Sequence, residues 1–227
     1  MTDSGTEINQ PKKAERIGVL GGTFDPIHHA HLRMAEESFE RLNLDRVLLV
    51  LSASPPHKEN EGITPFETRW KMLRAVCENN SRLVPVDLEA KRGGPSYTKD
   101  TLKAIRKEYG PDSELVLLVG MDSAVEFCSW KSYEEILELS RLVVFGRPGE
   151  DPKRIDPKVR DRMVLLDWDE FGISSTAIRR KVSEGKSIRY LVPPEVEEII
   201  EMEKLYRSPS GSRVSSEGNI AQGEVFV

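Results

Sequence analysis

The sequence predicts an α/β fold in which a Rossmann-like, doubly wound parallel sheet carries helices on both faces. Six short runs rich in valine and leucine are almost continuously apolar, as is typical of strands that are covered on both faces. Amphipathic stretches separate most of these runs, which indicates βαβ units with right-handed crossovers. The chain has 227 residues, which suits one such domain.

The predicted elements follow one another in a regular order. The apolar runs predict strands at residues 16–20, 46–51, 82–88, 114–119, 141–145 and 163–166. The spacing of apolar residues between them predicts helices at 31–42, 66–79, 98–109 and 133–139. Two C-terminal helices in succession, at 174–184 and 194–206, complete the pattern. Because ligands bind beyond the carboxyl ends of strands in such sheets, we look for functional residues in the loops there.

Both ends of the chain lack the apolar patterns of the predicted strands and helices. Residues 1–14 are polar and residues 207–227 are rich in serine and glycine, so we expect disordered tails around one domain at 15–206. The first fifteen residues hold no apolar core of a signal peptide, and no apolar run is long enough to span a membrane. We therefore expect a cytoplasmic protein with no membrane partner. Its oligomeric state stays open, with a homo-oligomer among the options.

Charge and cysteine content exclude further classes. Lys+Arg total 33 and Asp+Glu total 38, a net charge of −5, so we expect no nucleic acid bound by bulk positive charge. An anionic ligand must then be held by local groups. Cys77 and Cys128 lie too far apart in the sequence for a zinc motif, and we expect both to be buried thiols in a reducing compartment.

The most informative segment follows the first predicted strand and reads GGTFDPIHHAHL, residues 21–32. Paired glycines, Gly21 and Gly22, let a ligand approach the backbone closely, and the start of the next helix offers N–H groups to phosphate. His28 and His31 are three residues apart, so they project to the same side and can donate hydrogen bonds to phosphate oxygens. The segment matches neither the P-loop nor the G-x-G-x-x-G pattern.

A metal site is the rival interpretation of this segment. His29 and His31, together with Asp25, are ligand types that zinc or iron accepts. Catalytic metal sites usually need three or more protein ligands, and His57 is the only further histidine in the sequence. We therefore expect no resident metal.

A second polar cluster, GISSTAIRR at residues 172–180, lies at the start of a predicted helix. Ser174, Ser175 and Thr176 are typical of a helix N-cap. Arg179 lies about one turn into the helix, and its planar guanidinium fits phosphate oxygens. Such clusters are common in capped helices, but together with the first segment this one would place positive charge on both sides of a reacting phosphorus.

The two segments resemble the signatures of a known family. GGTFDPIH followed by AHL is similar to the nucleotidyltransferase signature G-x-F-x-P-x-H-x-G-H, in the version carried by bacterial nicotinate-mononucleotide adenylyltransferases. ISSTAIR resembles the family's second signature, which grips the triphosphate. Ala30 replaces the usual glycine, which matters only if that position needs a positive φ. The resemblance spans about residues 16–206 and implies a fold of the nucleotidyltransferase type.

The resemblance implies that ATP transfers its adenylyl group to nicotinic acid mononucleotide, giving deamido-NAD and pyrophosphate in NAD biosynthesis. Mg²⁺ would arrive with ATP. The catalytic residues would be His28, His31 and Arg179. The ATP-binding residues would be Gly21, Gly22, Thr23, Phe24, Gly120, Asp122, Ile173, Ser174, Ser175 and Thr176.

Further loops would bind the mononucleotide. Lys58, in PPHK, would hold its phosphate, and Tyr97 and Thr98, in SYTKDT, would meet the pyridine carboxylate. Trp130 would stack on the pyridine ring, a contact worth about 1 to 3 kcal/mol by analogy with bases on aromatic side chains. Arg147 would bind phosphate or have a structural role. A solvated lysine and a core tryptophan are the plain alternatives for Lys58 and Trp130.

Three alternatives to this function stay open. The same chemistry could act on nicotinamide mononucleotide or pantetheine phosphate, or a cytidylyl group could be transferred to a small phosphate. A nucleotide sensor could keep the fold without turnover. A metal-dependent hydrolase is the third.

Overall fold

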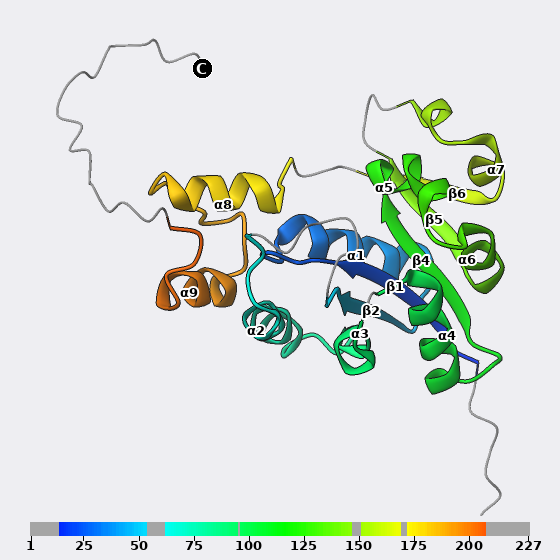
Figure 1. The fold of residues 1–227 in the computed structure, drawn as a ribbon, viewed down its shortest axis with the longest axis horizontal. Coiled ribbons are helices and arrows are strands. Elements are labelled where there is room, and N and C mark those ends of the chain that lie inside the picture. The colour runs from blue at the N-terminus through cyan, green and yellow to red at the C-terminus, as the bar shows by residue number, and fades with distance from the viewer. Residues whose placement is uncertain (1–13, 54–61, 95, 147–150, 169–171, 208–227) are drawn as a thin grey trace, which may run out of the picture.

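A sheet of six strands forms the centre of the molecule (Figure 1). The strands are β1 (Arg16–Gly22), β2 (Arg46–Leu51), β3 (Leu83–Val86), β4 (Glu114–Gly120), β5 (Arg141–Gly146) and β6 (Met163–Asp167). The structure is a computed structural model, and it describes residues 14–53, 62–94, 96–146, 151–168 and 172–207.

The strand order is β3-β2-β1-β4-β5-β6, and all neighbouring strands are parallel. The first three strands run outward from β1 to one edge, and β4 then starts on the other side of β1. This reversal leaves a crevice at the carboxyl ends of β1 and β4, which is where doubly wound sheets bind ligands. The predicted parallel α/β sheet is therefore confirmed.

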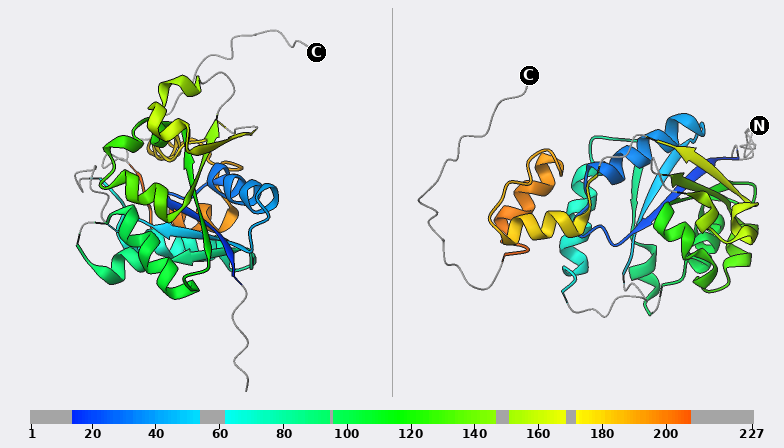
Figure 2. Two further views of the ribbon diagram at one scale, coloured as in Figure 1. Left: turned by 90° about the vertical axis from the view of Figure 1, so that its right-hand side faces the viewer. Right: turned by 90° about the horizontal axis from the view of Figure 1, so that it is seen from above.

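Helices cover both faces of the sheet, with α1 on one side and α4 and α6 on the other (Figure 2). The helices are α1 (His29–Arg41), α2 (Phe66–Cys77), α3 (Leu88–Arg92), α4 (Thr98–Tyr109), α5 (Met121–Val125), η1 (Phe127–Ser129), α6 (Tyr133–Leu139), η2 (Pro152–Arg154), α7 (Pro157–Arg160), α8 (Ser175–Ser183) and α9 (Pro194–Met202). Within the described ranges, no helix combines the length and the apolar character that crossing a membrane requires.

Each strand supplies side chains to two hydrophobic cores. In β2, Val47, Leu49 and Leu51 belong to the core that α1, α2, α8 and α9 share, whereas Leu48 and Val50 belong to the core of α4, α5, α6 and α7. All five side chains are buried. Successive side chains of a strand point to opposite faces, so a strand covered on both faces has to be apolar throughout.

The two C-terminal helices lie together beside α2, beyond the carboxyl end of β1 (Figures 1 and 2). Val196, Ile199 and Ile200 of α9 are buried in the same core as Met72 and Leu73 of α2. Burying each such side chain contributes roughly 1.5 to 3 kcal/mol. This packing holds α8 and α9 against the sheet edge where ligands are expected.

The structure corrects some boundaries and one burial prediction. The strand predicted at 82–88 ends at Val86, because the chain turns at Asp87 and continues as α3. Leu88 extends the apolar run in the sequence, but it belongs to that helix. The last helix ends at Met202, and Lys204 and Tyr206 then have positive φ values of 52° and 59°. Cys77 is buried as predicted, whereas Cys128 is only partly buried.

Candidate active site

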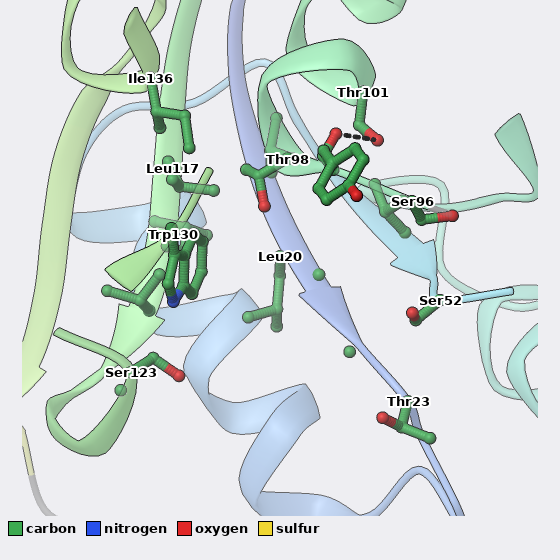
Figure 3. A pocket seen from close by; sticks show the side chains of 18 of the residues that line it. Leu20, Thr23, Ser52, Ser96, Thr98, Thr101, Leu117, Ser123, Trp130 and Ile136 are labelled. Atoms are coloured by element: carbon green, nitrogen blue, oxygen red, sulfur yellow. Dashed lines mark hydrogen bonds between the residues drawn. The ribbon is translucent and has the colours of Figure 1, made fainter. Parts of the chain in front are cut away.

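A pocket of about 510 Å³ opens at the carboxyl ends of β1 and β4, where the strand order reverses (Figure 3). This volume suits a small-molecule or cofactor site. Residues singled out from the sequence line it from four separate segments: Gly21, Gly22, Thr23, His31, Tyr97, Thr98, Gly120, Asp122 and Trp130. The fold therefore brings together many of the residues predicted to bind ATP and many of those predicted to bind the mononucleotide.

The two glycines at the end of β1 serve different purposes. A side chain at Gly21 would meet nothing within 4 Å, so a ligand has room to approach the backbone there. A Cβ at Gly22 would come within 2.6 Å of Cε1 of Phe24. Phe24 is buried, has an unusual φ of 45°, and contacts the His31 ring edge-on with 5.0 Å between centroids. Gly22 thus makes room for the ring that supports His31.

His28 and His31 form a stacked pair with 3.7 Å between ring centroids. Burial lowers the pKa of His28 to about 4, with a smaller contribution from His29. Burial in the pocket wall, and then the proximity of His28, lower the pKa of His31 well below its ordinary value. Both imidazoles are therefore neutral at pH 7.

The hydrogen bonding of the pair fixes which His31 nitrogen carries the proton. The backbone N–H of His28 donates to Nδ1 of His31 at 3.3 Å. A neutral imidazole that accepts at Nδ1 carries its proton on Nε2, so His31 has one N–H to offer a ligand. Nδ1 of His28, by contrast, has no hydrogen-bond partner within the described part of the chain.

The start of α1 offers fewer free N–H groups than predicted. The backbone N–H of His29 donates to the carbonyl of Leu191 at 3.1 Å, and that of His31 donates to the carbonyl of His28 at 3.0 Å. The loop between α8 and α9 packs on this helix start, a long-range contact that the local sequence does not indicate. Ala30 lies within α1 without a positive φ, so alanine causes no strain there.

Asp25, in the middle of the first segment, is 4% exposed. Its Oδ1 accepts a hydrogen bond from the Tyr206 hydroxyl at 2.6 Å, and its Oδ2 accepts one from the Thr64 backbone N–H at 3.2 Å. These two hydrogen bonds hold the segment in place through the Asp25 carboxylate. Among the described residues, no group of three His, Cys, Asp or Glu side chains could hold a metal ion.

Arg69 of α2 is a buried cation beside the same loop, with 2% exposure. Its guanidinium donates to the backbone carbonyls of Thr23, Ser52 and Thr64 at 2.8, 2.9 and 2.8 Å. Burial lowers its pKa, and the nearby Asp25 carboxylate acts in the opposite direction. Such hydrogen bonds and an opposite charge are what a buried cation requires. Arg69 thereby ties the ends of β1 and β2 together.

The second segment packs against the first one. Nη1 of Arg179 donates to the Asp25 carbonyl at 2.7 Å, and Nη2 lies 3.4 Å from the Thr176 hydroxyl, to which it donates. The Ser175 hydroxyl donates to the Pro26 carbonyl at 2.9 Å. The sequence predicts these groups as phosphate ligands, whereas the structure shows them engaged within the protein.

The remaining predicted ATP ligands also lie apart from the pocket wall. The Ser174 hydroxyl caps α8 by accepting from the Ala177 N–H at 3.2 Å. His28 and Phe24 are buried behind His31. The residues that do not line the pocket are His28, Phe24, Ile173, Ser174, Ser175, Thr176 and Arg179. Their roles in binding ATP stay predictions.

The other end of the pocket is formed by the start of α4 and by Trp130. Figure 3 shows Thr98 and Trp130 among the side chains that surround the pocket. Trp130 stacks on Phe127 with 4.9 Å between ring centroids, and Nζ of Lys131 lies 4.0 Å from the centroid of the Tyr97 ring. Lys131 lines the pocket, and the sequence reasoning did not single it out. Lys58 and Arg147 lie outside the described residues.

Glu89 is a second pocket residue that the sequence reasoning missed. It lies on α3, is 8% exposed, and accepts a hydrogen bond at Oε1 from the Thr101 hydroxyl at 3.0 Å. Its Oε2 is buried and has no hydrogen-bond partner within the described residues. Its position directly after the strand predicted at 82–88 was the available signal, but a single acidic residue with no motif around it was not singled out.

Comparisons with known proteins agree with this geometry. Residues 19–181 match a family described as cytidylyltransferase-like. A probable nicotinate-nucleotide adenylyltransferase of Syntrophotalea carbinolica is 42% identical over 218 residues, which cover 87% of this chain and 100% of that protein. One from Desulfitobacterium hafniense is 41% identical over 207 residues, covering 88% of this chain and 99% of that protein.

The fold is also found among solved structures. A Plasmodium falciparum nicotinic acid mononucleotide adenylyltransferase complexed with NaAD has a TM-score of 0.71 and 21% sequence identity to this chain. The match covers 85% of this chain and 97% of that one. At this identity, the likeness concerns the fold alone.

Proposed function

Because the chain belongs to the cytidylyltransferase-like family and to its nicotinate-nucleotide adenylyltransferases, we propose that it joins the adenylyl group of ATP to nicotinic acid mononucleotide. The products are deamido-NAD and pyrophosphate. One observation carries the proposal: a single pocket is lined by His31 and the open backbone of Gly21, and also by Trp130 and Thr98. The first pair suits a phosphate and the second a flat ring with a polar substituent.

In the proposed reaction, a phosphate oxygen of the mononucleotide attacks the α-phosphorus of ATP in line. The new P–O bond forms as the bond to the leaving pyrophosphate breaks, and no covalent enzyme intermediate is needed. The protein then acts by positioning the two substrates and by stabilising charge on the phosphate oxygens.

His31 is the pocket residue best suited to the reacting phosphate. Its Nε2–H is free of the intramolecular bond that Nδ1 makes with the His28 backbone. An anionic phosphate beside the ring favours the protonated imidazole, so binding of ATP would raise the low pKa of His31. The hydrogen bond would strengthen as negative charge grows on the oxygens. His28 would support His31 by stacking on it.

Ser174, Ser175, Thr176 and Arg179 would hold the β- and γ-phosphates. Arg179 uses one donor on the Asp25 carbonyl and another on Thr176, and a guanidinium has five N–H donors in all. It can therefore fix the loop and bind phosphate at the same time. Mg²⁺ would arrive with ATP, held mainly by phosphate oxygens and water.

Trp130 would stack on the pyridine ring, with Tyr97 and Thr98 at the pyridine carboxylate. Lys131 adds a positive charge next to Tyr97, which favours an acidic substituent there. Lys58 would hold the mononucleotide phosphate, and Arg147 would bind phosphate or have a structural role.

One observation favours nicotinamide mononucleotide as a second acceptor. Glu89 lines the pocket, its Oε2 has no hydrogen-bond partner among the described residues, and a carboxylate oxygen accepts hydrogen bonds. A carboxamide has N–H donors to offer it, whereas a carboxylate has none. We therefore expect some turnover of the amide beside that of the acid.

A competition assay tests both acceptors. The full chain is incubated with ATP, Mg²⁺ and equal amounts of nicotinic acid and nicotinamide mononucleotides, and the dinucleotides are quantified by mass spectrometry. Predominant deamido-NAD with matching pyrophosphate supports the proposal, and predominant NAD overturns its specificity. If folded protein that binds ATP formed neither product, the sensor alternative would be favoured.

A further inference from the structure

The end of the C-terminal helical segment reaches into the signature loop. Tyr206 follows α9 and is far in sequence from the pocket residues, yet its hydroxyl donates to Oδ1 of Asp25 at 2.6 Å. Tyr206 is only partly exposed, and burial and then the neighbouring Asp25 raise its pKa. The hydroxyl therefore keeps its proton and remains a donor under ordinary conditions.

Three separate segments converge on Asp25. Besides the Tyr206 bond, Oδ2 accepts from the Thr64 backbone N–H at 3.2 Å, and the Asp25 carbonyl accepts from Arg179 at 2.7 Å. The loop before α2, the helix α8 and the chain after α9 thus all fix one residue. Arg69 supplies the balancing charge from α2.

The residue that these segments hold lies directly beside the reactive part of the loop. Phe24 precedes Asp25, is buried with a φ of 45°, and contacts the His31 ring edge-on. A positive φ at phenylalanine costs energy and needs surrounding contacts to maintain it. If the Tyr206 hydroxyl were removed, Oδ1 of Asp25 would lose its donor in a buried site, and the loop would be free to relax.

We propose that Tyr206 is a positioning residue for adenylyl transfer: its hydroxyl fixes Asp25, and through Phe24 it fixes His31 at the pocket. This inference rests on the proposed function. Tyr206 itself does not line the pocket, so it acts on substrate only through the loop. The plain alternative is that the tyrosine merely anchors the end of the C-terminal segment.

The test compares one variant with two controls. Tyr206→Phe removes only the hydroxyl. Tyr190→Phe makes the same change in the loop between α8 and α9, where the side chain is 83% exposed. Glu203→Gln weakens the attachment of the α9 end to α2, because Glu203 accepts hydrogen bonds from Thr68 and Lys71 at 3.0 and 2.8 Å. The second control loosens the same region without touching Asp25.

We expect Tyr206→Phe to lower kcat about 10- to 100-fold, the loss expected when a reacting group is misplaced by about 1 Å. KM for ATP should change by less than about threefold, since the loss falls on positioning. Both controls should retain kcat within about twofold. Equal kcat losses in Tyr206→Phe and Glu203→Gln, or an unchanged kcat in Tyr206→Phe, would overturn the proposal. So would a Tyr206→Phe variant that is unfolded by circular dichroism at 10 °C, because the role would then be structural.

A second measurement does not depend on turnover. The ¹⁵N resonances of the His31 imidazole are recorded by NMR in the ligand-free full chain. We expect them to shift in Tyr206→Phe and to stay in place in both controls. If the wild type formed no dinucleotide while this pattern held, the proposed function would fail and the contact would stand. Unchanged His31 resonances in Tyr206→Phe would refute the coupling itself.

Discussion

Acidification should destabilise the folded protein through the stacked histidine pair. In the unfolded chain His28 takes up a proton near its ordinary pKa of 6.5, whereas burial lowers its pKa to about 4 in the folded state. Between these values the unfolded state binds more protons, so the free energy of unfolding falls as the pH is lowered. The part of the free energy of unfolding that depends on a neutral His28 is therefore fully present above about pH 6.5. It is lost as the pH falls from there to about 4.

The size of the effect follows from the shift. One pKa unit corresponds to 1.36 kcal/mol, so a shift from 6.5 to about 4 is worth about 3 kcal/mol in full. At pH 5 the unfolded His28 is almost fully protonated and the folded one is not, which amounts to about 2 kcal/mol. His31 acts in the same direction, because its pKa is lowered as well. This is a large part of the stability of an ordinary domain.

Urea unfolding at pH 7.5 and pH 5.0 measures the prediction. The wild type should lose about 2 kcal/mol more than His28→Gln, which keeps a polar side chain but does not titrate. His29→Gln preserves the stacked pair and serves as the control, so it should retain most of the wild-type loss. If wild type and His28→Gln lost equal free energy between the two pH values, the imidazole would not be held neutral by the fold, and the reasoning would be wrong.

Four further predictions concern the pocket and the thiols. His31→Ala should lower kcat by about 100-fold or more in steady-state assays, while calorimetry shows a smaller loss of ATP affinity. Trp130→Ala should raise KM for the mononucleotide about 5- to 150-fold and leave KM for ATP nearly unchanged; a selective loss of ATP affinity would contradict its assignment. Glu89→Gln should lower kcat/KM for nicotinamide relative to nicotinic acid mononucleotide, and an unchanged ratio would place Oε2 outside the acceptor site. Burial raises the pKa of Cys77 to about 12, and Cys128 is less buried although its pKa is raised too, so native protein at pH 8 should label faster at Cys128 than at Cys77, as mass spectrometry of the labelled peptides would show.

Local patterns predicted the sheet and much of the pocket. The nearly continuous apolar runs around residues such as Leu48 and Leu117 identified strands that are buried on both faces. Because parallel strands end at one edge of a sheet, loops after different strands had to meet there. Gly21, Thr98 and Trp130 are far apart in the sequence and line one pocket for this reason.

Local sequence patterns could not predict contacts between residues that are far apart in the chain. Arg69 carries no motif, yet it joins three backbone carbonyls from two strand ends and the loop before α2. Tyr206 has the pattern of an ordinary helix end, and only the packing of α9 on α2 brings it to Asp25. Glu89 follows the predicted strand as a single acidic residue without a motif, and only the structure shows that it is buried and accepts a hydrogen bond from Thr101.

Tyr206 comes later in the chain than all six strands and every residue that lines the pocket. A ribosome makes all six strands, which end at Asp167, and every pocket-lining residue before it reaches α9. A nascent or clipped chain without the end of that helix would thus contain the signature loop but lack the hydroxyl donor for Asp25. If Tyr206 has the positioning role proposed above, such a chain would hold His31 less firmly at the pocket although every residue that lines the pocket is present.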